Sequence, residues 1–468
     1  MKTNKLFILT GLAAIASTSC SQKENTSGQP AKPMNILYIM TDDHSFQTIS
    51  AYDKRYIQTP NIDRIANEGV RFTNSFVANS ISGPSRACML TGKHSHKNGF
   101  IDNGEKRQIE GYATNITTDL ALDWLDNKRD KSKPFCLLLH HKAPHRTWMP
   151  DTCDLRLYDD VTFPLPENFY DDYAGRIAAS EQEMSIIKDM DIVYDLKMAD
   201  KENEIHSSNA DLEKYGRELY NRMNPDQKAA WDAYYDPIIQ DFKAKKRTGK
   251  ELAEWKYQRY MHDYLRVIHS VDRNIGIVLD YLEKNDLLDN TLIVYTSDQG
   301  FYMGEHGWFD KRFMYEESFR TPLLMRLPGG KKGDIPQLVQ NIDYAPTFLE
   351  LAGAPIPADI QGESLLPLLK GERPENWRNS LYYHYYEYPA EHSVKRHYGV
   401  RDDRYKLIHF YNDIDVWELY DLQEDPHEMN NLYGKPSYEA VMKRMRDELY
   451  KLQKQYDDPV GIRFNVSD

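Results

Sequence analysis

The sequence predicts an α/β fold: a large, mixed but mostly parallel sheet sandwiched by helices, followed by a small C-terminal antiparallel sheet with one helix. Three nearly continuous apolar runs have the pattern of strands buried on both faces: residues 34–40, 135–139 and 291–295. Segments with helical spacing lie between them: residues 61–69, 115–125 and 257–287. From about residue 372 short tyrosine-rich runs replace this pattern, which predicts the small sheet, with a final helix at residues 438–455.

The N-terminus has the features of an export signal. Lys2 and Lys5 precede an apolar run, residues 6–16, that is too short to span a bilayer. The run leads to Ala-Ser-Thr-Ser-Cys20, which looks like a loose bacterial lipobox; a plain secretory signal is the alternative. With a lipobox, Cys20 would be lipidated, and the protein would be exported to the periplasm or outer membrane, meeting the membrane only through this anchor.

Four segments therefore make up the predicted organisation. They are a signal with its lipobox cysteine, a flexible polar tether, a main domain and a smaller α+β subdomain: residues 1–20, 21–33, 34–370 and 371–468.

Composition narrows the classes of function. The 468-residue chain has 28% charged residues and a formal net charge of -13, which argues against a nucleic-acid binder. An anionic substrate would have to be drawn by local cations and metal. Apart from Cys20 there are three cysteines, whose spacing matches no metal or redox motif; we expect Cys88 and Cys136 to be buried thiols.

Polar clusters follow all three predicted strands. Asp42 and Asp43 follow the first, Asp298 and Gln299 follow the third, and the second leads into a Lys-Ala-Pro-His sequence. Open α/β sheets place their ligand sites at the carboxyl ends of strands. Carboxylate and amide oxygens are hard ligands of the kind that Ca²⁺ takes, whereas an isolated Asp pair is also typical of helix capping.

The most informative stretch is Ser82-Gly-Pro-Ser-Arg86, which continues as Ala-Cys-Met-Leu-Thr-Gly92. Its proline suits the first turn of a helix, whose free N–H groups favour an anion. A capped helix start is the alternative for Ser-x-Pro-Ser-Arg alone. The full stretch resembles the sulfatase activation motif, (C or S)-x-P-S-R-x-x-x-L-T-G, at every fixed position.

This resemblance is to the type I, formylglycine-dependent sulfatases of the alkaline-phosphatase-like superfamily, and most to bacterial N-acetylglucosamine-6-sulfatases. It implies that a serine-type radical maturase oxidises Ser82 to formylglycine, a built-in cofactor. It also implies a single bound divalent cation, Ca²⁺. The implied ligands are Asp42, Asp43, Ser82, Asp298 and Gln299, the last standing where the family has Asn or His.

The resemblance further implies a sulfated glycan substrate and a set of roles. The hydrated aldehyde from Ser82 attacks sulfur while Arg86 braces it, Lys311 contacts the sulfate, and His145 protonates the leaving alcohol. The second hydroxyl of the hydrated aldehyde is then deprotonated, which expels sulfate and restores the aldehyde. A bare serine has no second hydroxyl for this step. Lys142 is either a substrate contact or a solvated lysine. His392 and His397 are either sugar contacts or a surface pair on a hairpin.

One block of the family pattern is missing. A sulfatase normally continues after its activation motif to a Gly-Lys-Trp-His block, which supplies a sulfate-binding lysine and a histidine beside the formylglycine. Here residues 98–100 pass almost directly to residues 111–119, and no such block occurs. We do not assign the missing roles to Lys93, His94 or His96. The chain is therefore predicted to turn over sulfate esters poorly.

Two alternatives to a working sulfatase are a chain that binds sulfated glycan without turnover and a phosphomonoester or phosphonate hydrolase of the same fold.

Overall fold

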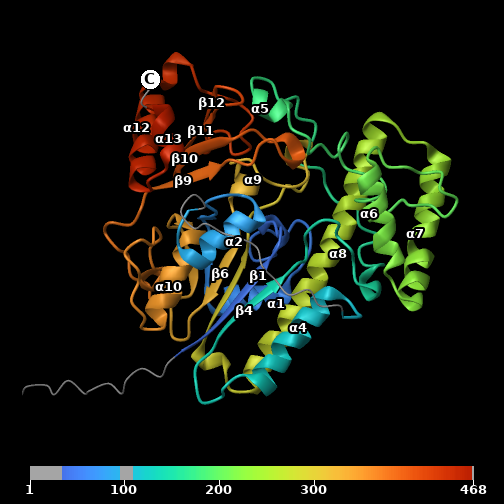
Figure 1. Ribbon diagram of the computed structural model, residues 1–468, viewed down its shortest axis with the longest axis horizontal. Helices are drawn as coiled ribbons and strands as arrows, with labels where there is room; N and C mark the ends of the chain where they lie inside the picture. The colour runs from blue at the N-terminus through green and yellow to red at the C-terminus, as the bar shows by residue number, and fades with distance from the viewer. Residues whose placement is uncertain (1–33, 95–108, 466–468) are drawn as a thin grey trace, which may run out of the picture. The chain divides into compact units, whose positions relative to one another are not determined.

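The computed structural model describes residues 34–94 and 109–465 (Figure 1). The predicted signal, Cys20 and the tether lie outside the described residues, as does His96. Within the described part of the chain, no helix combines the length and apolar character that crossing a membrane requires.

The main sheet joins six strands of the described chain in the order β4-β1-β5-β6-β2-β7. They are β1 (Asn35–Thr41), β2 (Val70–Phe72), β4 (Cys136–His141), β5 (Thr291–Ser297), β6 (Leu323–Arg326) and β7 (Gly333–Ile335). β1 pairs in parallel with both β4 and β5, so the three predicted strands are neighbours and end at one edge. β2 and β7 are also parallel, whereas β6 runs antiparallel to β5 and β2. The mixed, mostly parallel sheet is confirmed.

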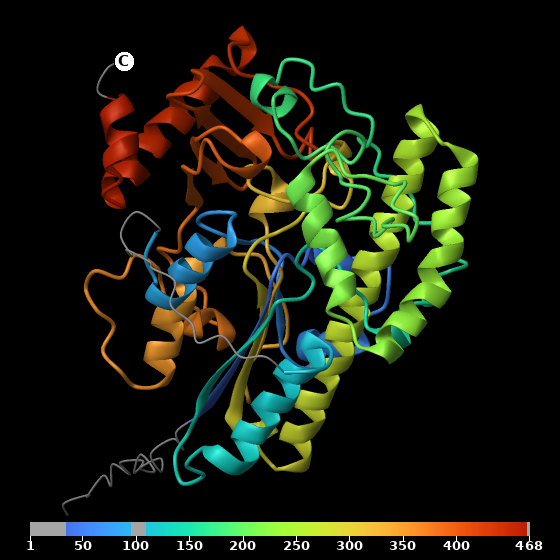
Figure 2. The same ribbon diagram turned by 45° about the vertical axis from the view of Figure 1, so that its right-hand side comes forward.

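Helices cover both faces of this sheet, as predicted. One face packs on helices that include α1 (Pro60–Glu68), α4 (Ala113–Asp123) and α8 (Gly249–Lys284). The other packs on α2 (Ser82–Thr91), α10 (Tyr344–Leu351) and α11 (Leu366–Leu369). Figure 2 shows α2 and α10 to the left of the sheet and α4 and α8 to its right.

Asp272 of α8 fixes the start of α1. Its carboxylate accepts hydrogen bonds from the backbone N–H groups of Asn61 and Ile62, at 3.1 and 2.8 Å. These donors have no partner within their own helix, so a carboxylate there is stabilising. The tie holds α1 against α8 beneath the sheet.

Two further helices lie beside α8 (Figure 1). These are α6 (Ala210–Asn221) and α7 (Pro225–Lys245), after a single turn, α5 (Ile177–Ser180). Asn224 and Gln227 form a capping box at the start of α7, with Pro225 in its first turn. Three short elements lie elsewhere in the chain: β3 (Ser75–Phe76) pairs with β8 (Val339–Gln340), and α9 (Glu316–Phe319) is a single helical turn.

β4 departs from its prediction. Phe135 to Leu139 reads as a strand buried on both faces, but β4 is an edge strand of the described sheet, and the side chains of Cys136 and Leu138 are exposed. The expected buried thiol at position 136 is therefore wrong, whereas Cys88 is buried as expected.

The C-terminal part is an antiparallel sheet of four described strands in the order β12-β11-β10-β9. The strands are β9 (Ser380–Tyr385), β10 (His397–Asp402), β11 (Tyr405–Phe410) and β12 (Val416–Asp421). α12 (Glu439–Gln455) packs on one face, and the other face packs on aromatic residues of the 302–319 segment. A second short helix, α13 (Pro459–Asn465), follows and was not predicted. The domain boundary at residue 370 stays a prediction.

Candidate active site

The two acidic pairs meet at the carboxyl edge of the main sheet. Asp42 and Asp43 follow β1, and Asp298 and Gln299 follow β5. The backbone N–H of Asp43 donates to Asp298 Oδ1 at 3.1 Å, and the side-chain amide of Gln299 donates to the Asp43 carboxylate. All four side chains are buried. The parallel pairing of the two strands thus builds one acidic cluster from residues far apart in sequence.

Ser82 lies within this cluster. It is the first residue of α2, and its Oγ donates a hydrogen bond to Asp42 Oδ1 at 2.9 Å. The side-chain amide of Gln299 donates in turn to Ser82 Oγ at 3.3 Å. The preceding residue, Ile81, gives α2 no side-chain cap, so the N–H groups of its first turn favour an anionic group. The predicted nucleophile therefore lies between the acidic cluster and the positive end of a helix.

Two cations, the partly exposed Arg86 and the buried Lys311, neutralise part of the cluster. Arg86, one turn along α2 from Ser82, places Nη2 2.8 Å from Asp42 Oδ2 and Nε 3.1 Å from Asp298 Oδ2. The Lys311 ammonium forms an ion pair with Asp43. Each of the three carboxylates thus has a cationic partner, and the structure brings Arg86 and Lys311 together at the acidic cluster.

The three carboxylates are nevertheless electrostatically frustrated. Burial, followed by repulsion from Asp42, raises the pKa of Asp298 to about 8. Burial also disfavours the charged form of Asp42, but the surrounding cations, Lys311 first, outweigh it and lower the pKa of Asp42 to about 2. A bound cation would relieve the repulsion among these carboxylates.

The donor set fits a divalent cation. Asp43 Oδ2 and Gln299 Oε1 are buried and accept no hydrogen bond from the described residues. One ligand atom from each of Asp42, Asp43 and His145 lies within 4.8 Å of the others. Hard oxygen atoms are the ligands that Ca²⁺ and Mg²⁺ take. A cation held among them would satisfy the two orphaned oxygens.

His145 and Lys142 come from the segment after β4 and face the cluster from its open side. His145 Nε2 lies 3.8 Å from Asp43 Oδ2, and its Nδ1 lies 2.7 Å from the carbonyl oxygen of Arg146. Lys142 Nζ lies 3.5 Å from Asp42 Oδ2, with a side chain that is 66% exposed. His145 is thus held by its backbone bond with Nε2 toward the cluster, whereas Lys142 is free to move.

Sequence reasoning missed two residues that flank Lys311. Asp310 and Arg312 are buried and paired with each other, and both have a positive φ, at 76° and 99°. Non-glycine residues in this conformation cluster at functional sites. The available signal was three consecutive charged residues in an otherwise aromatic segment. His392 joins them: its Nε2 lies 3.3 Å from Asp310 Oδ2, which brings the C-terminal part next to Lys311.

His397 is not brought to the site, which corrects the expectation of a sugar contact. Its side chain is fully buried, with Nε2 accepting from the Met314 N–H at 3.2 Å and Nδ1 2.8 Å from the Lys395 carbonyl oxygen. Burial lowers its pKa to about 3. The ring stacks on Phe313 and Tyr383. His397 is a core residue, because both ring nitrogens are satisfied internally.

Lys93 and His94 do not replace the missing block either. Lys93 pairs with Asp359, and His94 packs against Tyr382 and Tyr456. None of these contacts joins the acidic cluster.

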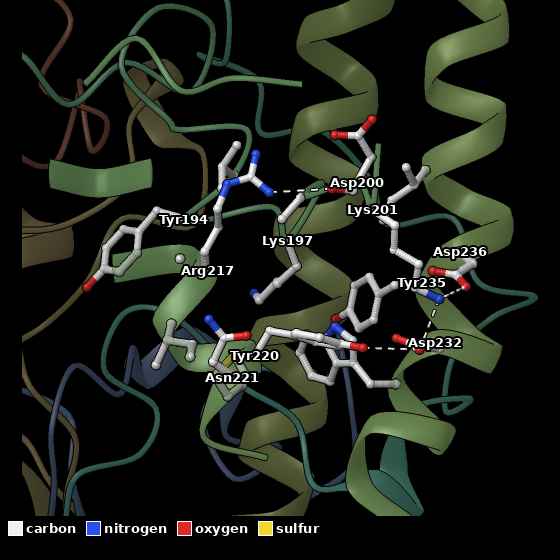
Figure 3. Close-up of a pocket in the computed structure, with 17 residues that line it drawn as sticks. Tyr194, Lys197, Asp200, Lys201, Arg217, Tyr220, Asn221, Asp232, Tyr235 and Asp236 are labelled. Carbon is white, nitrogen blue, oxygen red and sulfur yellow. Dashed lines mark hydrogen bonds and ion pairs between the residues drawn. The ribbon is translucent and has the colours of Figure 1, made fainter. Parts of the chain in front are cut away.

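A cavity of about 1100 Å³ opens beside the cluster. Lys142, His145 and Arg146 line it together with residues of α4, α6 and α7. A smaller one of about 260 Å³ adjoins it between α6 and α7 (Figure 3). In the smaller cavity Lys201 forms ion pairs with Asp232 and Asp236, at 3.0 and 2.7 Å. The larger cavity borders the acidic cluster, because His145 and Lys142 line the cavity and also face the cluster.

A candidate nucleophile at a helix N-terminus, beside donors that fit a divalent cation, is the arrangement expected of a metal-assisted ester hydrolase. The chain matches two protein-family models. The sulfatase model matches residues 34–110 and 100–354, and the model for the C-terminal part of N-sulphoglucosamine sulphohydrolase matches residues 304–455. The chain therefore belongs to the sulfatase family, whose members hydrolyse sulfate esters and typically use a metal ion and formylglycine.

Individual relatives agree. An N-acetylglucosamine-6-O-sulfatase of Bacteroides thetaiotaomicron is 46% identical, covering 98% of this chain and 92% of that protein. A solved structure described as a complex with its substrate D-glucosamine-2-N,6-O-disulfate superposes with a TM-score of 0.86 at 46% identity, covering 92% of this chain and 99% of that one. A phosphonate monoester hydrolase from Silicibacter pomeroyi has a TM-score of 0.65 at 19% identity, covering 90% and 96%, and shows the shared fold alone.

Proposed function

We propose that this protein hydrolyses the 6-O-sulfate ester of a glucosamine residue, N-acetylated or N-sulfated, in a glycosaminoglycan or mucin glycan. The observation that carries the proposal is Ser82, bonded to Asp42 at the start of α2 and surrounded by Arg86, Lys311 and His145. The relatives named for this chemistry support the choice of sugar.

In the proposed reaction the chain positions the nucleophile and neutralises the sulfate. Position 82, once oxidised to formylglycine, supplies a hydrated aldehyde. Asp42, Asp43, Asp298 and Gln299 would hold the cation, with Ca²⁺ as the proposed ion, which neutralises sulfate oxygens when bound. The Arg86 guanidinium, 2.8 Å from Asp42, fixes the carboxylate that accepts the hydrogen bond of position 82.

In the proposed reaction His145 protonates the leaving alcohol. Its Nε2 faces the cluster at the mouth of the larger cavity, so it can donate a proton to the departing sugar oxygen. Lys311 is buried beside Asp43, where its charge can stabilise a sulfate oxygen in the transition state. His392, with Asp310 and Arg312, is proposed to contact the sugar, and Lys142 to contact the substrate at the exposed rim.

Turnover by this chain is proposed to be low. Its alignment with the 46%-identical relative is 525 positions long, but the chain has 468 residues, so at least 57 positions of the relative have no counterpart here. The family model matches in two parts whose junction, residues 100–110, is where the Gly-Lys-Trp-His block is missing. Removing one donor from such a site costs about 3 kcal/mol, or ~10² in rate.

The test is to co-express the chain with a serine-type radical maturase and to analyse the peptide containing Ser82 by mass spectrometry. We expect the aldehyde at position 82, and slow sulfate release from N-acetylglucosamine 6-sulfate that Ser82→Ala abolishes. Ser82→Cys is the matched control, because it keeps a side chain that maturases oxidise. Intact serine, or faster hydrolysis of a phosphomonoester than of any sulfated sugar, would overturn the proposal.

Export is proposed on the N-terminal sequence alone. Lipidation at Cys20 would place the enzyme at the periplasm or outer membrane, where glycan fragments arrive. Labelling with a palmitate analogue should mark the wild type and not Cys20→Ala; equal labelling of both would refute the anchor.

A further inference from the structure

Asp263 of α8 is buried beside more positive charge than it can neutralise. Its Oδ2 accepts a hydrogen bond from Lys197 Nζ at 3.0 Å, and its Oδ1 lies 3.2 and 3.3 Å from the guanidinium groups of Arg259 and Arg266. Arg266 also pairs with Asp159 at 2.7 Å. Three cations therefore share two carboxylates. The side chains of Asp263 and of the three cations are at most 10% exposed, so solvent screens this excess of positive charge little.

Lys197 has hydrogen-bonding capacity that this network does not use. An ammonium group has three N–H donors, and among the described residues Asp263 is the one hydrogen-bond acceptor that Lys197 Nζ meets. Burial lowers the pKa of Lys197, although Asp263 opposes the shift. The backbone of Lys197 has a positive φ of 59°, a conformation that non-glycine residues often adopt at functional sites. A second acceptor, above all an anion, would stabilise the charged form of Lys197.

Lys197 lies on the floor of the smaller cavity, the one of about 260 Å³ between α6 and α7 (Figure 3). In this view its ammonium group ends between Arg217 and Asn221. The side chain of Lys197 is 5% exposed, whereas that of Lys201, which also lines the cavity, is 57% exposed. The cavity therefore has a mouth that is open to solvent and a buried, positively charged floor.

The walls of this cavity are mainly aromatic and aliphatic. They are formed by the rings of Tyr194, Tyr220, Trp231 and Tyr235 and by the apolar side chains of Met149, Val193, Leu219 and Ile239. Flat apolar surfaces of this kind cover the C–H faces of a sugar, while a few polar groups fix its orientation. A volume of about 260 Å³ lies slightly below the range of about 300–1,000 Å³ for drug-sized ligands, so it suits a single sugar unit.

The smaller cavity adjoins the larger one, which borders the acidic cluster. Both cavities are lined by Met149, Tyr194, Leu219 and Trp231. The Arg146 guanidinium lies over the Tyr194 ring at 5.2 Å, and Arg146 lines the larger cavity together with His145. A sugar in the larger cavity would therefore lie one aromatic side chain away from the smaller cavity.

We propose that the smaller cavity is a second binding site, which takes a sugar unit that carries a carboxylate or sulfate group held by the Lys197 ammonium. The anion accepts from an N–H donor that Asp263 leaves free, and it balances the excess positive charge. The aromatic walls hold the ring of the sugar. This inference rests on the proposed function only for the ligand being a sugar; the binding of an anion at Lys197 does not depend on sulfate release.

Calorimetric titration with methyl glucuronide tests the site. Its carboxylate is the probe, and methyl glucoside, which lacks the charge, is the matched neutral ligand. We expect saturable binding of the glucuronide to the wild type and about tenfold weaker binding to Lys197→Met, because a charge-assisted hydrogen bond is lost. Methyl glucoside should bind both proteins equally weakly. Lys284→Met, the same change at an exposed position of α8, is the control and should bind the glucuronide as the wild type does.

Lys197→Met is expected to fold, because Arg259 and Arg266 still neutralise Asp263 in this variant. Protection from chemical modification is a second measurement, which needs no variant. Methyl glucuronide at ten times its Kd should slow the reductive methylation of Lys197 about tenfold, because the unliganded form is the one that reacts. Mass spectrometry of the wild type should show no such protection of Lys284, and none of either lysine by methyl glucoside.

Sulfate release distinguishes two sources of the anionic sugar. The substrates are N-acetylglucosamine 6-sulfate and a disaccharide in which a uronic acid is attached to this sugar. If the anionic sugar belongs to the same glycan chain as the sulfate ester, Lys197→Met lowers kcat/KM for the disaccharide alone. If a separate molecule supplies it, kcat/KM is unchanged for both substrates and the cavity binds a free sugar.

Three outcomes overturn the proposal: no saturable binding of methyl glucuronide, equal binding by the wild type and Lys197→Met, or equal protection of Lys197 by methyl glucoside. The first outcome means that water alone satisfies the Lys197 ammonium. The proposed function fails separately. Glucuronide binding by a matured chain that releases no sulfate leaves this site standing and contradicts the proposed function.

Discussion

Ser82 Oγ and Asp42 Oδ1 lie 2.9 Å apart, although 40 positions separate them in the chain. One stands at the start of a helix and the other at the end of a parallel strand, so the sheet edge brings the reactive position and its carboxylate together. The same carboxylate is held by Arg86 through its other oxygen at 2.8 Å. A substitution at this edge therefore alters the surroundings of position 82, and substitutions of the individual residues can test their separate roles.

The loss of activity on removing His145, the proposed general acid, should depend on the leaving group of the substrate. For His145→Ala we expect a loss of about 10²–10³ in kcat/KM with a sulfated sugar, whose alkoxide needs a proton. With an activated aryl sulfate the loss should be under about tenfold, because a phenolate departs unprotonated. His145→Gln is the control for side-chain volume. Equal losses on both substrates, measured by sulfate release, would refute the role.

Cation binding should stabilise the fold. Three buried carboxylates share one site, so a divalent ion bound at 100 times its Kd should add about 2.7 kcal/mol to the free energy of unfolding. We expect Ca²⁺ to raise the unfolding temperature of chelator-treated protein by a few degrees, and less so in Asp298→Asn. Asp289→Asn, at an exposed surface position, is the control. No shift with Ca²⁺ or Mg²⁺ contradicts the metal site.

The two histidines of the C-terminal part should behave oppositely. His392→Ala, beside Asp310, is expected to lower kcat/KM for the sulfated sugar by about tenfold while leaving an aryl sulfate almost unaffected. His397→Ala removes a buried, doubly bonded ring and should destabilise the fold by about 3 kcal/mol instead. Kinetics and thermal unfolding of both variants distinguish these effects. A normal unfolding temperature for His397→Ala would contradict its core role.

The outcomes at these two histidines show what sequence can reach. They lie five positions apart, and which of them faces Asp310 depends on the φ of 69° at His392 and the pairing of β10, which no local pattern encodes. The polar clusters that follow the strands could be predicted, because buried apolar runs indicate parallel strands. The carboxyl ends of parallel strands meet at one edge of the sheet. The half-exposed β4 could not be predicted, because burial on its second face depends on a neighbour from elsewhere in the chain.

Glu418 should make stability fall as pH rises. It is buried on β12, where it accepts hydrogen bonds from the hydroxyls of Tyr315 and Tyr420 at 2.9 and 2.8 Å. Burial outweighs these bonds and raises its pKa from 4.5 to about 7. Between these values the folded protein keeps a proton that the unfolded chain has lost. The stabilisation is therefore complete below pH 4.5 and is lost as pH rises to 7.

The full effect of this one group is about 3 kcal/mol. Glu418→Gln keeps the shape and the acceptor oxygen but does not titrate, so its free energy of unfolding should fall by correspondingly less across the same pH window. Urea unfolding of both proteins at a series of pH values from 4.5 to 7.5 measures the difference. Parallel pH profiles for the two proteins would show that folding leaves the pKa of Glu418 unshifted.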